Sequence, residues 1–221
     1  MRLNDLRYVA SVVPLSLALL LAGCAGDVDD DPVDSAGSAA SEVAAYEKVI
    51  RNGTSVESKT TPTAAESAST KLTGWIPNVA PEKVLTRLLT VGSWKDITDA
   101  EGERPFTQSS LVRQSGTGNV RTVDAKLSLS AGVDIDAKAT AKEDGTNLSV
   151  KIVNTSEYRH WFVGTVLKKE KLVIDLELVP YKSGTIVKAS MKLKLESVED
   201  RAPGVTKTLV PMFDWLKRTS R

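Results

Sequence analysis

The chain has a single cysteine and a single histidine among its 221 residues, and aromatic residues make up only 5% of it. One cysteine excludes an internal disulfide, and one histidine excludes a histidine cluster that would hold zinc or iron. The formal net charge is only +1, which argues against a broadly basic nucleic-acid binder. The sequence also lacks a serine nucleophile elbow and a glycine-rich phosphate loop. The 41% of apolar residues is enough for a folded core. The missing residues and motifs together predict a non-enzymatic protein without cofactor, metal or nucleic-acid partner.

The N-terminus carries a targeting signal. Two arginines precede an apolar run over residues 9–22, which is shorter than the about 20 residues of a membrane span and is typical of a signal peptide. The run ends in Leu21-Ala22-Gly23-Cys24, which resembles the lipobox of bacterial lipoproteins. This resemblance implies lipid on the Cys24 thiol, cleavage before it and acylation of the new N-terminus. The alternative is an ordinary secretory signal with an incidental cysteine.

The residue after the acceptor cysteine bears on the final membrane. In Gram-negative lipoproteins an aspartate at that position usually signals retention in the inner membrane, and this chain has Ala25 there. The resemblance therefore implies a protein anchored by lipid to the periplasmic face of the outer membrane. Such an anchor is almost irreversible, because each buried methylene contributes about 0.8 kcal/mol.

Composition divides the chain into four segments. Residues 1–23 are the predicted signal peptide, and residues 24–41 carry five aspartates without a basic residue, which predicts an acidic disordered tether. Residues 42–69 predict a short helix over 42–52 and then a Ser/Thr-rich linker that is either loop or weak strand. Residues 70–218 predict the folded domain. Once the signal is removed, the tether carries −5 and the rest of the chain +5.

The apolar pattern of residues 70–218 predicts an α+β fold built on a curved antiparallel meander. Apolar residues occupy ten successive odd positions from Val123 to Ala141, which predicts two strands or one strand bent sharply near Gly132. A turn follows at residues 143–145. The other predicted strands cover residues 71–76, 148–152, 158–167, 172–178 and 187–195.

Prolines mark the predicted helices. Pro81 begins a short helix that ends at Gly92, and a second helical turn follows over 93–97. Pro203 begins a C-terminal amphipathic helix, and Pro211 predicts a kink or break within it.

This order of elements, with Ala80-Pro81-Glu82-Lys83-Val84-Leu85 opening the first helix and Trp94 after it, resembles the START-like (SRPBCC) helix-grip superfamily. The resemblance covers about residues 70–218. It implies that the sheet and the C-terminal helix enclose an apolar cavity for a hydrophobic, lipid-like ligand. The side chains that could line the cavity are Trp161, Phe162, Met191, Phe213, Trp215 and Leu216. The same residues can equally form an ordinary core.

Charged residues give weaker indications of function. His160 has no predicted acid or nucleophile beside it, so a surface or structural role is favoured over that of a general base. Asp134 and Asp136 share the polar face of a strand, where simple solvation is favoured over acid–base chemistry.

Lysines gather around the last two strands of the meander, at Lys168, Lys169, Lys171, Lys188, Lys192 and Lys194. They could contact anionic lipid headgroups or an acidic partner, although lysines on strands more often confer solubility and deter edge pairing. Two function classes therefore remain open. One is an envelope lipoprotein that carries a hydrophobic ligand, for which a pocket of about 300 Å³ or more is expected. The other is a non-catalytic interaction module of an envelope complex with a solid core.

Overall fold

The computed structural model describes residues 35–61, 67–129, 133–160, 164–196 and 208–221, and residues 36–221 form one compact unit. The first elements in chain order are α1 (Ser35–Asn52), β1 (Ser55–Thr61), β2 (Ser67–Pro77), α2 (Pro81–Leu89), the 3-10 helix η1 (Val91–Asp96), β3 (Phe106–Thr117) and β4 (Val120–Leu129). The remaining elements are β5 (Val133–Asp144), β6 (Asn147–Asn154), β7 (Tyr158–His160), β8 (Gly164–Leu167), β9 (Leu172–Tyr181), β10 (Gly184–Lys194) and α4 (Leu209–Thr219).

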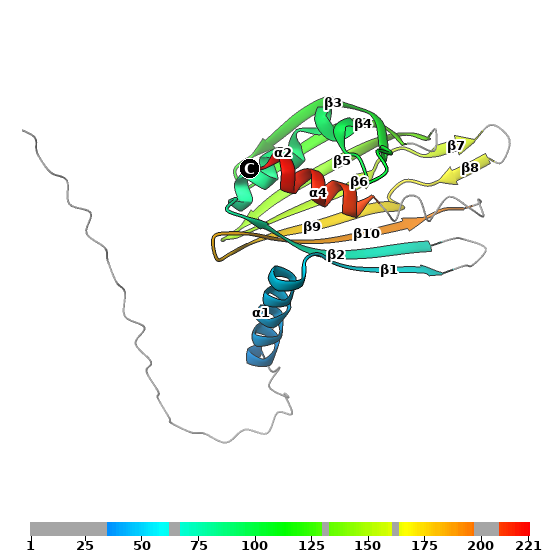
Figure 1. Ribbon diagram of the computed structural model, residues 1–221. Helices are drawn as coiled ribbons and strands as arrows, with labels where there is room; N and C mark the ends of the chain where they lie inside the picture. Colours follow the sequence, from blue (N-terminus) through cyan, green and yellow to red (C-terminus); the bar gives the residue numbers. More distant parts are fainter. Residues whose placement is uncertain (1–34, 62–66, 130–132, 161–163, 197–207) are drawn as a thin grey trace, which may run out of the picture. The chain divides into compact units, whose positions relative to one another are not determined.

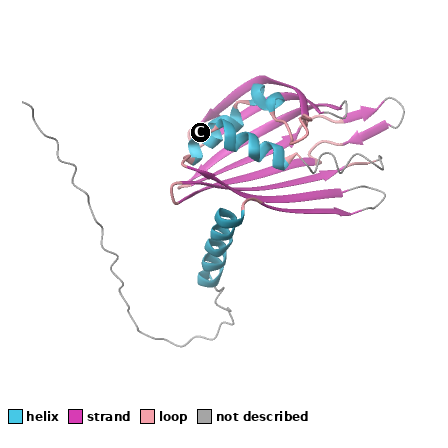
Figure 2. Ribbon diagram, viewed as in Figure 1, coloured by secondary structure: helices cyan, strands magenta, loops and turns pink. Residues whose placement is uncertain are grey.

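Eight strands form one antiparallel sheet in the order β1-β2-β10-β9-β6-β5-β4-β3, and β7 pairs with β8 in a separate two-stranded sheet (Figure 1). Figure 2 shows α2 and α4 in the hollow of the curved sheet. The predicted fold class, α+β with a curved antiparallel sheet and a C-terminal helix, is confirmed. None of the helices that the structure describes is long and apolar enough to cross a bilayer.

The strands with clear alternation form as the sequence predicts. The long run of odd apolar positions divides into β4 and β5, which pair with each other so that Leu127 lies opposite Ile135. Their odd residues from Val123 to Leu127 and from Val133 to Ala141 are buried, and the even residues between them are exposed or half-buried. Strands β6, β9 and β10 continue the same pattern, because one face of each packs on the core.

Strand β3 was not expected from the sequence. It lies at one edge of the sheet, and from Thr107 onward none of its residues is buried. Leu111 is 52% exposed although it pairs with the buried Ala125. Because no face of β3 beyond Phe106 is covered, its sequence carries no alternation that could have revealed a strand.

The single strand predicted over 158–167 is wrong. The chain instead forms two short strands, β7 and β8, which pair with each other. The buried Asn154 closes the base of this excursion: its amide donates to the carbonyls of Ser156 (2.9 Å) and Lys168 (2.8 Å) and accepts from the Leu172 N–H (2.8 Å). Strand β6 therefore pairs directly with β9, and the segment between them leaves the main sheet.

Both terminal helices differ from their predicted bounds. Helix α1 begins at Ser35 rather than at residue 42, so the last seven residues of the predicted disordered tether are helical, in keeping with the high helix propensity of the alanines there. Helix α4 begins at Leu209, and Pro203 lies outside the described residues. Pro211 therefore stands in the first turn, where N–H groups lack a helical partner anyway, and it does not divide the helix.

The Ser/Thr-rich segment after α1 is ordered as strand where it is described. Strand β1 pairs with β2 over seven residues, from Ser55 opposite Thr73 to Thr61 opposite Ser67. The main sheet therefore begins before residue 70. The alternatives of loop and weak strand are decided in favour of strand for residues 55–61 and 67–69.

Candidate functional site

The face of the sheet that α2 and α4 cover, called here the concave face, is lined mainly by apolar side chains across six strands, with Thr70 as a buried polar residue on β2. One row of side chains crosses it through the pairings of β2, β10, β9, β6, β5 and β4, in the order Thr70, Met191, Ile174, Ile152, Ala139 and Val123. Every residue in this row is at most 4% exposed. A hydrophobic molecule placed here would be held by burial and dispersion forces.

Small side chains occupy the part of the concave face formed by β5 and β4. Three successive inward positions of β5 are Ala137, Ala139 and Ala141, and Ala125 of β4 lies opposite the first of them. Each side chain fills little volume, so the helices or a ligand can approach the sheet closely at this point.

The ring of Phe213 on α4 packs closely against strand β2 of the sheet. Gly74 of β2 lies under its ring, and a β-carbon at this position would fall within 3 Å of three ring carbons. The glycine that weakens β2 as a strand is thus the residue that lets α4 seat on the sheet. Phe213 is 2% exposed and Leu216 is fully buried, so both belong to the contact between helix and sheet.

Trp215 has a different neighbour from Phe213. Its ring stacks under the guanidinium of Arg87 on α2, with the guanidinium carbon 4.9 Å from the ring centroid. Its indole N–H is buried and has no hydrogen-bond partner among the described residues. Trp215 therefore belongs to the contact between α2 and α4.

The other residues predicted for the site lie outside the described part of the chain. These are Trp161 and Phe162, and also Cys24 with the lipobox around it. His160 is the last residue of β7. The role of Met191, Phe213 and Leu216 in binding a ligand stays a prediction, although all three lie in one hydrophobic core.

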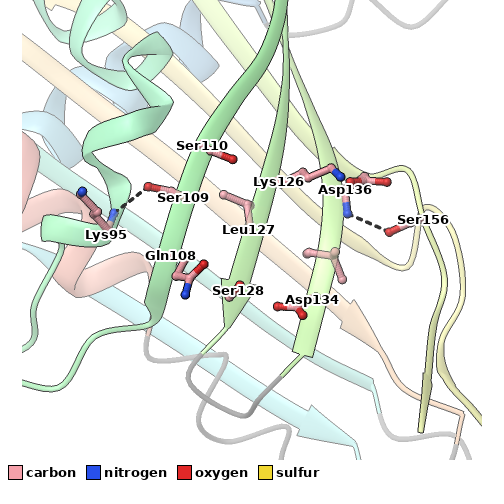
Figure 3. A pocket seen from close by; sticks show the side chains of 11 residues that line it. Lys95, Gln108, Ser109, Ser110, Lys126, Leu127, Ser128, Asp134, Asp136 and Ser156 are labelled. Atoms are coloured by element: carbon pink, nitrogen blue, oxygen red, sulfur yellow. Dashed lines mark hydrogen bonds between the residues drawn. The ribbon is translucent and has the colours of Figure 1, made fainter. Parts of the chain in front are cut away.

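Asp134 and Asp136 lie on the opposite, convex face of the sheet, as the alternation predicts. With Lys95, Gln108, Lys126 and several serines they line an open groove of about 670 Å³ over β3, β4 and β5 (Figure 3). Asp136 lies opposite Lys126, and Asp124 lies opposite Lys138 in the same strand pair. Cross-strand pairs of opposite charge stabilise a strand register, which explains Asp136 without catalysis. Asp134 lies opposite Ser128 and is exposed to solvent. In the described part of the chain no three His, Cys, Asp or Glu side chains gather closely enough to hold a metal ion.

The C-terminal half of α1 contacts the β9–β10 turn. Glu47 accepts a hydrogen bond from the Tyr181 hydroxyl (2.6 Å) and pairs with Lys182 (2.7 Å). The Tyr46 ring meets Tyr181 edge to face at 5.3 Å, and Glu42 pairs with Lys188. These partners are more than 130 positions apart in the chain, so no local pattern in the sequence could reveal them.

These contacts shift several pKa values. Hydrogen bonds from Lys188 to Glu42 and from Lys182 to Glu47 lower the pKa of each carboxyl below its ordinary value. Burial alone would lower the pKa of Lys188, but its hydrogen bonds and nearby carboxylates outweigh burial and raise it. Lys188 and both glutamates are therefore charged at neutral pH, and the ion pairs hold α1 on the sheet.

The chain was compared with protein families, curated proteins and solved structures. No protein-family model matches the chain, and no curated protein sequence matches it. Among solved structures it is similar to the lipid transfer and protein localization domain of human StarD13, with a TM-score of 0.43 and 11% identity over 80% of this chain and 95% of that one. It is also similar to human StAR-related lipid transfer protein 5, with a TM-score of 0.41 and 11% identity over 83% of this chain and 96% of that one.

A START superfamily protein from Mycobacterium smegmatis is a further neighbour, with a TM-score of 0.39 and 10% identity over 74% of this chain and 92% of that one. The structural neighbours are thus START-like domains. The fold described above rests on this chain's own strands and helices.

Proposed function

We propose that the chain is a lipid-anchored protein of the bacterial cell envelope that binds a hydrophobic, lipid-like ligand against its concave face. The observation that carries the proposal is the apolar concave face itself, which spans six strands and is covered by two helices of nine and eleven residues. The lipobox-like Leu21-Ala22-Gly23-Cys24 supports the anchor, and Ala25 supports the periplasmic face of the outer membrane as its place.

The alanines of β5 are the proposed seat of the ligand. Ala139 lies in the same row as Met191, so a ligand between them would touch the sheet along its middle. Entry requires α4 to move relative to β2, because the Phe213 ring rests directly on Gly74. The role proposed for Phe213 and Leu216 is to close the apolar face over the bound ligand.

A fluorescent apolar probe, N-phenyl-1-naphthylamine, tests the proposal on the full chain. Ala139→Leu adds volume on the concave face, and Thr140→Leu adds it on the opposite face of the same strand as a matched control. We expect the wild type and T140L to bind the probe and to release it to extracted envelope lipids, whereas A139L binds it at least tenfold more weakly. Absence of probe binding to the wild type would overturn the proposal.

One observation favours the second candidate, a non-catalytic interaction module with a solid core. Met191, Phe213 and Leu216 are each at most 2% exposed, and the contact of Phe213 with Gly74 is that of a filled core. In a solid core Phe213→Ala would cost about 3–5 kcal/mol of stability and A139L about 1–3 kcal/mol through overpacking. These full penalties, together with absent probe binding, would select the interaction module.

The anchor is tested separately. Cys24→Ser removes the thiol that the lipobox would use, so we expect the variant to leave the membrane fraction or to keep its signal segment, as read by fractionation and intact mass. Unchanged processing and unchanged membrane attachment would contradict lipidation at Cys24.

A further inference from the structure

Five lysines gather at the end of the sheet where β8 leads into β9 and where β10 ends. This group, called here the basic end, comprises Lys168, Lys169, Lys171, Lys192 and Lys194. In Figure 1 it lies at the end of the sheet opposite the β9–β10 turn. The backbone N–H of Lys194 donates to the carbonyl of Lys171 (2.9 Å), which holds the two lysine-bearing segments together. Among the described residues of these segments the acidic side chains are Glu170 and Glu196, which leaves a net charge of +3 for the described part of the basic end.

One carboxylate, that of Glu196, interacts electrostatically with three of these lysines. Glu196 pairs with Lys168 at 3.0 Å. The hydrogen bond from Lys168 lowers the pKa of Glu196 most strongly, burial opposes it, and the charges of Lys194 and Lys171 lower the pKa further. Among the described residues no carboxylate lies within ion-pair distance of Lys171, Lys192 or Lys194. The local potential is therefore positive and is not compensated within this part of the protein.

Lys171, Lys192 and Lys194 surround a shallow groove of about 350 Å³. Lys192 pairs across the strands with Ser69, and Lys194 pairs with Ser67. Both serines line the groove together with the three lysines, and Glu170 contributes one carboxylate to its lining. Ammonium and hydroxyl groups are donors to phosphate oxygens, so the groove offers the donors that an anionic headgroup needs.

We propose that the basic end docks on an anionic membrane surface, with Lys171, Lys192 and Lys194 contacting lipid phosphates. Charge complementarity argues for this occupant, because clusters of lysines are attracted to anionic bilayers. By sequence, residues 197–207 hold two acidic and two basic residues and Glu66 is one further acid, so a sum that counts all of them is still positive. The contact is independent of the lipid anchor and of any ligand on the concave face.

Sedimentation of the full chain with lipid vesicles tests this docking. Vesicles of phosphatidylcholine alone are compared with vesicles that also contain phosphatidylglycerol, because the difference between the two reports on charge and the substitutions below assign it to the basic end. We expect stronger binding to the anionic vesicles, and loss of that difference at about 1 M salt, where the Debye length is only about 3 Å.

The triple variant K171Q/K192Q/K194Q is expected to lose roughly 100-fold of the anionic preference, since each lysine near such a surface contributes about fivefold. The control K95Q/K126Q/K138Q removes three exposed lysines over η1, β4 and β5 and is expected to keep the preference. Equal binding of the triple variant and the wild type, or an equal loss in the control, would overturn the proposal.

Competition by inorganic phosphate separates a membrane surface from a discrete phosphate site. At matched ionic strength we expect no displacement from anionic vesicles, because a bilayer presents many phosphates at once. Displacement by phosphate would overturn the proposal in favour of a site for a single phosphate. Since no concave-face ligand enters these measurements, their failure would leave the proposed function intact, and failure of probe binding would leave the docking intact.

Discussion

Lysines at the two ends of the β9–β10 strand pair differ in whether they form ion pairs. At the end that contacts α1, Lys182 pairs with Glu47 at 2.7 Å, and Lys188 pairs with Glu42 and with Glu177, the latter at 3.3 Å. At the basic end three lysines have no carboxylate partner among the described residues. Both sets stand on the same two strands and their adjoining turns, so a strand preference for lysine explains neither.

The lysine charges at the α1 end are paired with carboxylates of the protein, whereas three lysine charges at the basic end have no carboxylate partner in the described structure. The α1 end is neutralised within the protein and holds a helix in place. In the described part of the chain the basic end has more lysines than carboxylates, so mutual repulsion costs some stability there, and this excess charge is what the proposed contact with an anionic surface would use.

The largest effect on stability is expected from Asn154, which orders the turn that carries Lys168 to Lys171. Asn154→Ala would leave the buried Leu172 N–H and two part-buried carbonyls without their partner, at about 1–3 kcal/mol for the buried group and less for each carbonyl. We expect a loss of about 3 kcal/mol in chemical denaturation, together with weaker binding to anionic vesicles. Asn147→Ala, at an exposed position of β6, serves as the control, and an equally stable N154A would contradict the role of Asn154 in closing this turn.

A smaller effect is expected where α1 contacts the sheet. Lys188→Gln removes the ion pairs with Glu42 and Glu177 and the contact with the Tyr46 ring, and should cost about 1 kcal/mol, with faster hydrogen exchange in α1. Lys192→Gln, on the same face of the same strand, should change stability by less than about 0.5 kcal/mol. Equal effects of the two substitutions would remove the distinction between the two ends.

Acid should act on the two ends with opposite sign. The pKa values of Glu42 and Glu47 are lowered by their lysine partners, so their contribution is complete above the ordinary value of 4.5 and is lost as pH falls through the lowered values. We expect hydrogen exchange of α1 to rise below about pH 4.5. The pKa of Glu196 is also lowered, and its protonation frees Lys168, so binding to anionic vesicles should strengthen over the same range. Two responses of the same sign would contradict this assignment.

The smallest expected effect is on the stability of the triple variant at the basic end. K171Q/K192Q/K194Q removes charges that have no intramolecular partner in the described structure, so its midpoint of thermal unfolding should stay the same or rise slightly. A clear loss of stability would show that these lysines hold the fold together rather than being available to a partner.

The sequence predicts the strands that have one buried and one solvated face. Strands β4, β5, β6, β9 and β10 follow from alternation, and Pro81 marks the start of α2. Strand β3 was missed because its exposed residues have no such pattern, and 158–167 was misread as one strand. The excursion there depends on Asn154, whose partners lie two to eighteen positions away and leave no periodic signal.

The candidate site was predictable in part. The burial of Met191, Phe213 and Leu216 follows from their places on the apolar faces of a strand and a helix, and the structure places them in the core, whereas their role in ligand binding stays a prediction. The fit of Phe213 on Gly74 joins residues 139 positions apart, and the contact of Glu42 with Lys188 joins residues 146 positions apart. Such pairs depend on the tertiary fold, which the local pattern does not encode.

The most direct test of the central claim is mass spectrometry of the natively purified full chain for a co-purifying lipid. The account predicts a bound lipid-like molecule in a fixed ratio to protein, in addition to any lipid attached covalently at Cys24. It should be retained in Thr140→Leu and lost in Ala139→Leu, whose added volume lies on the concave face. A chain that carries no such molecule, or that retains it equally in both variants, would contradict a hydrophobic ligand on the concave face.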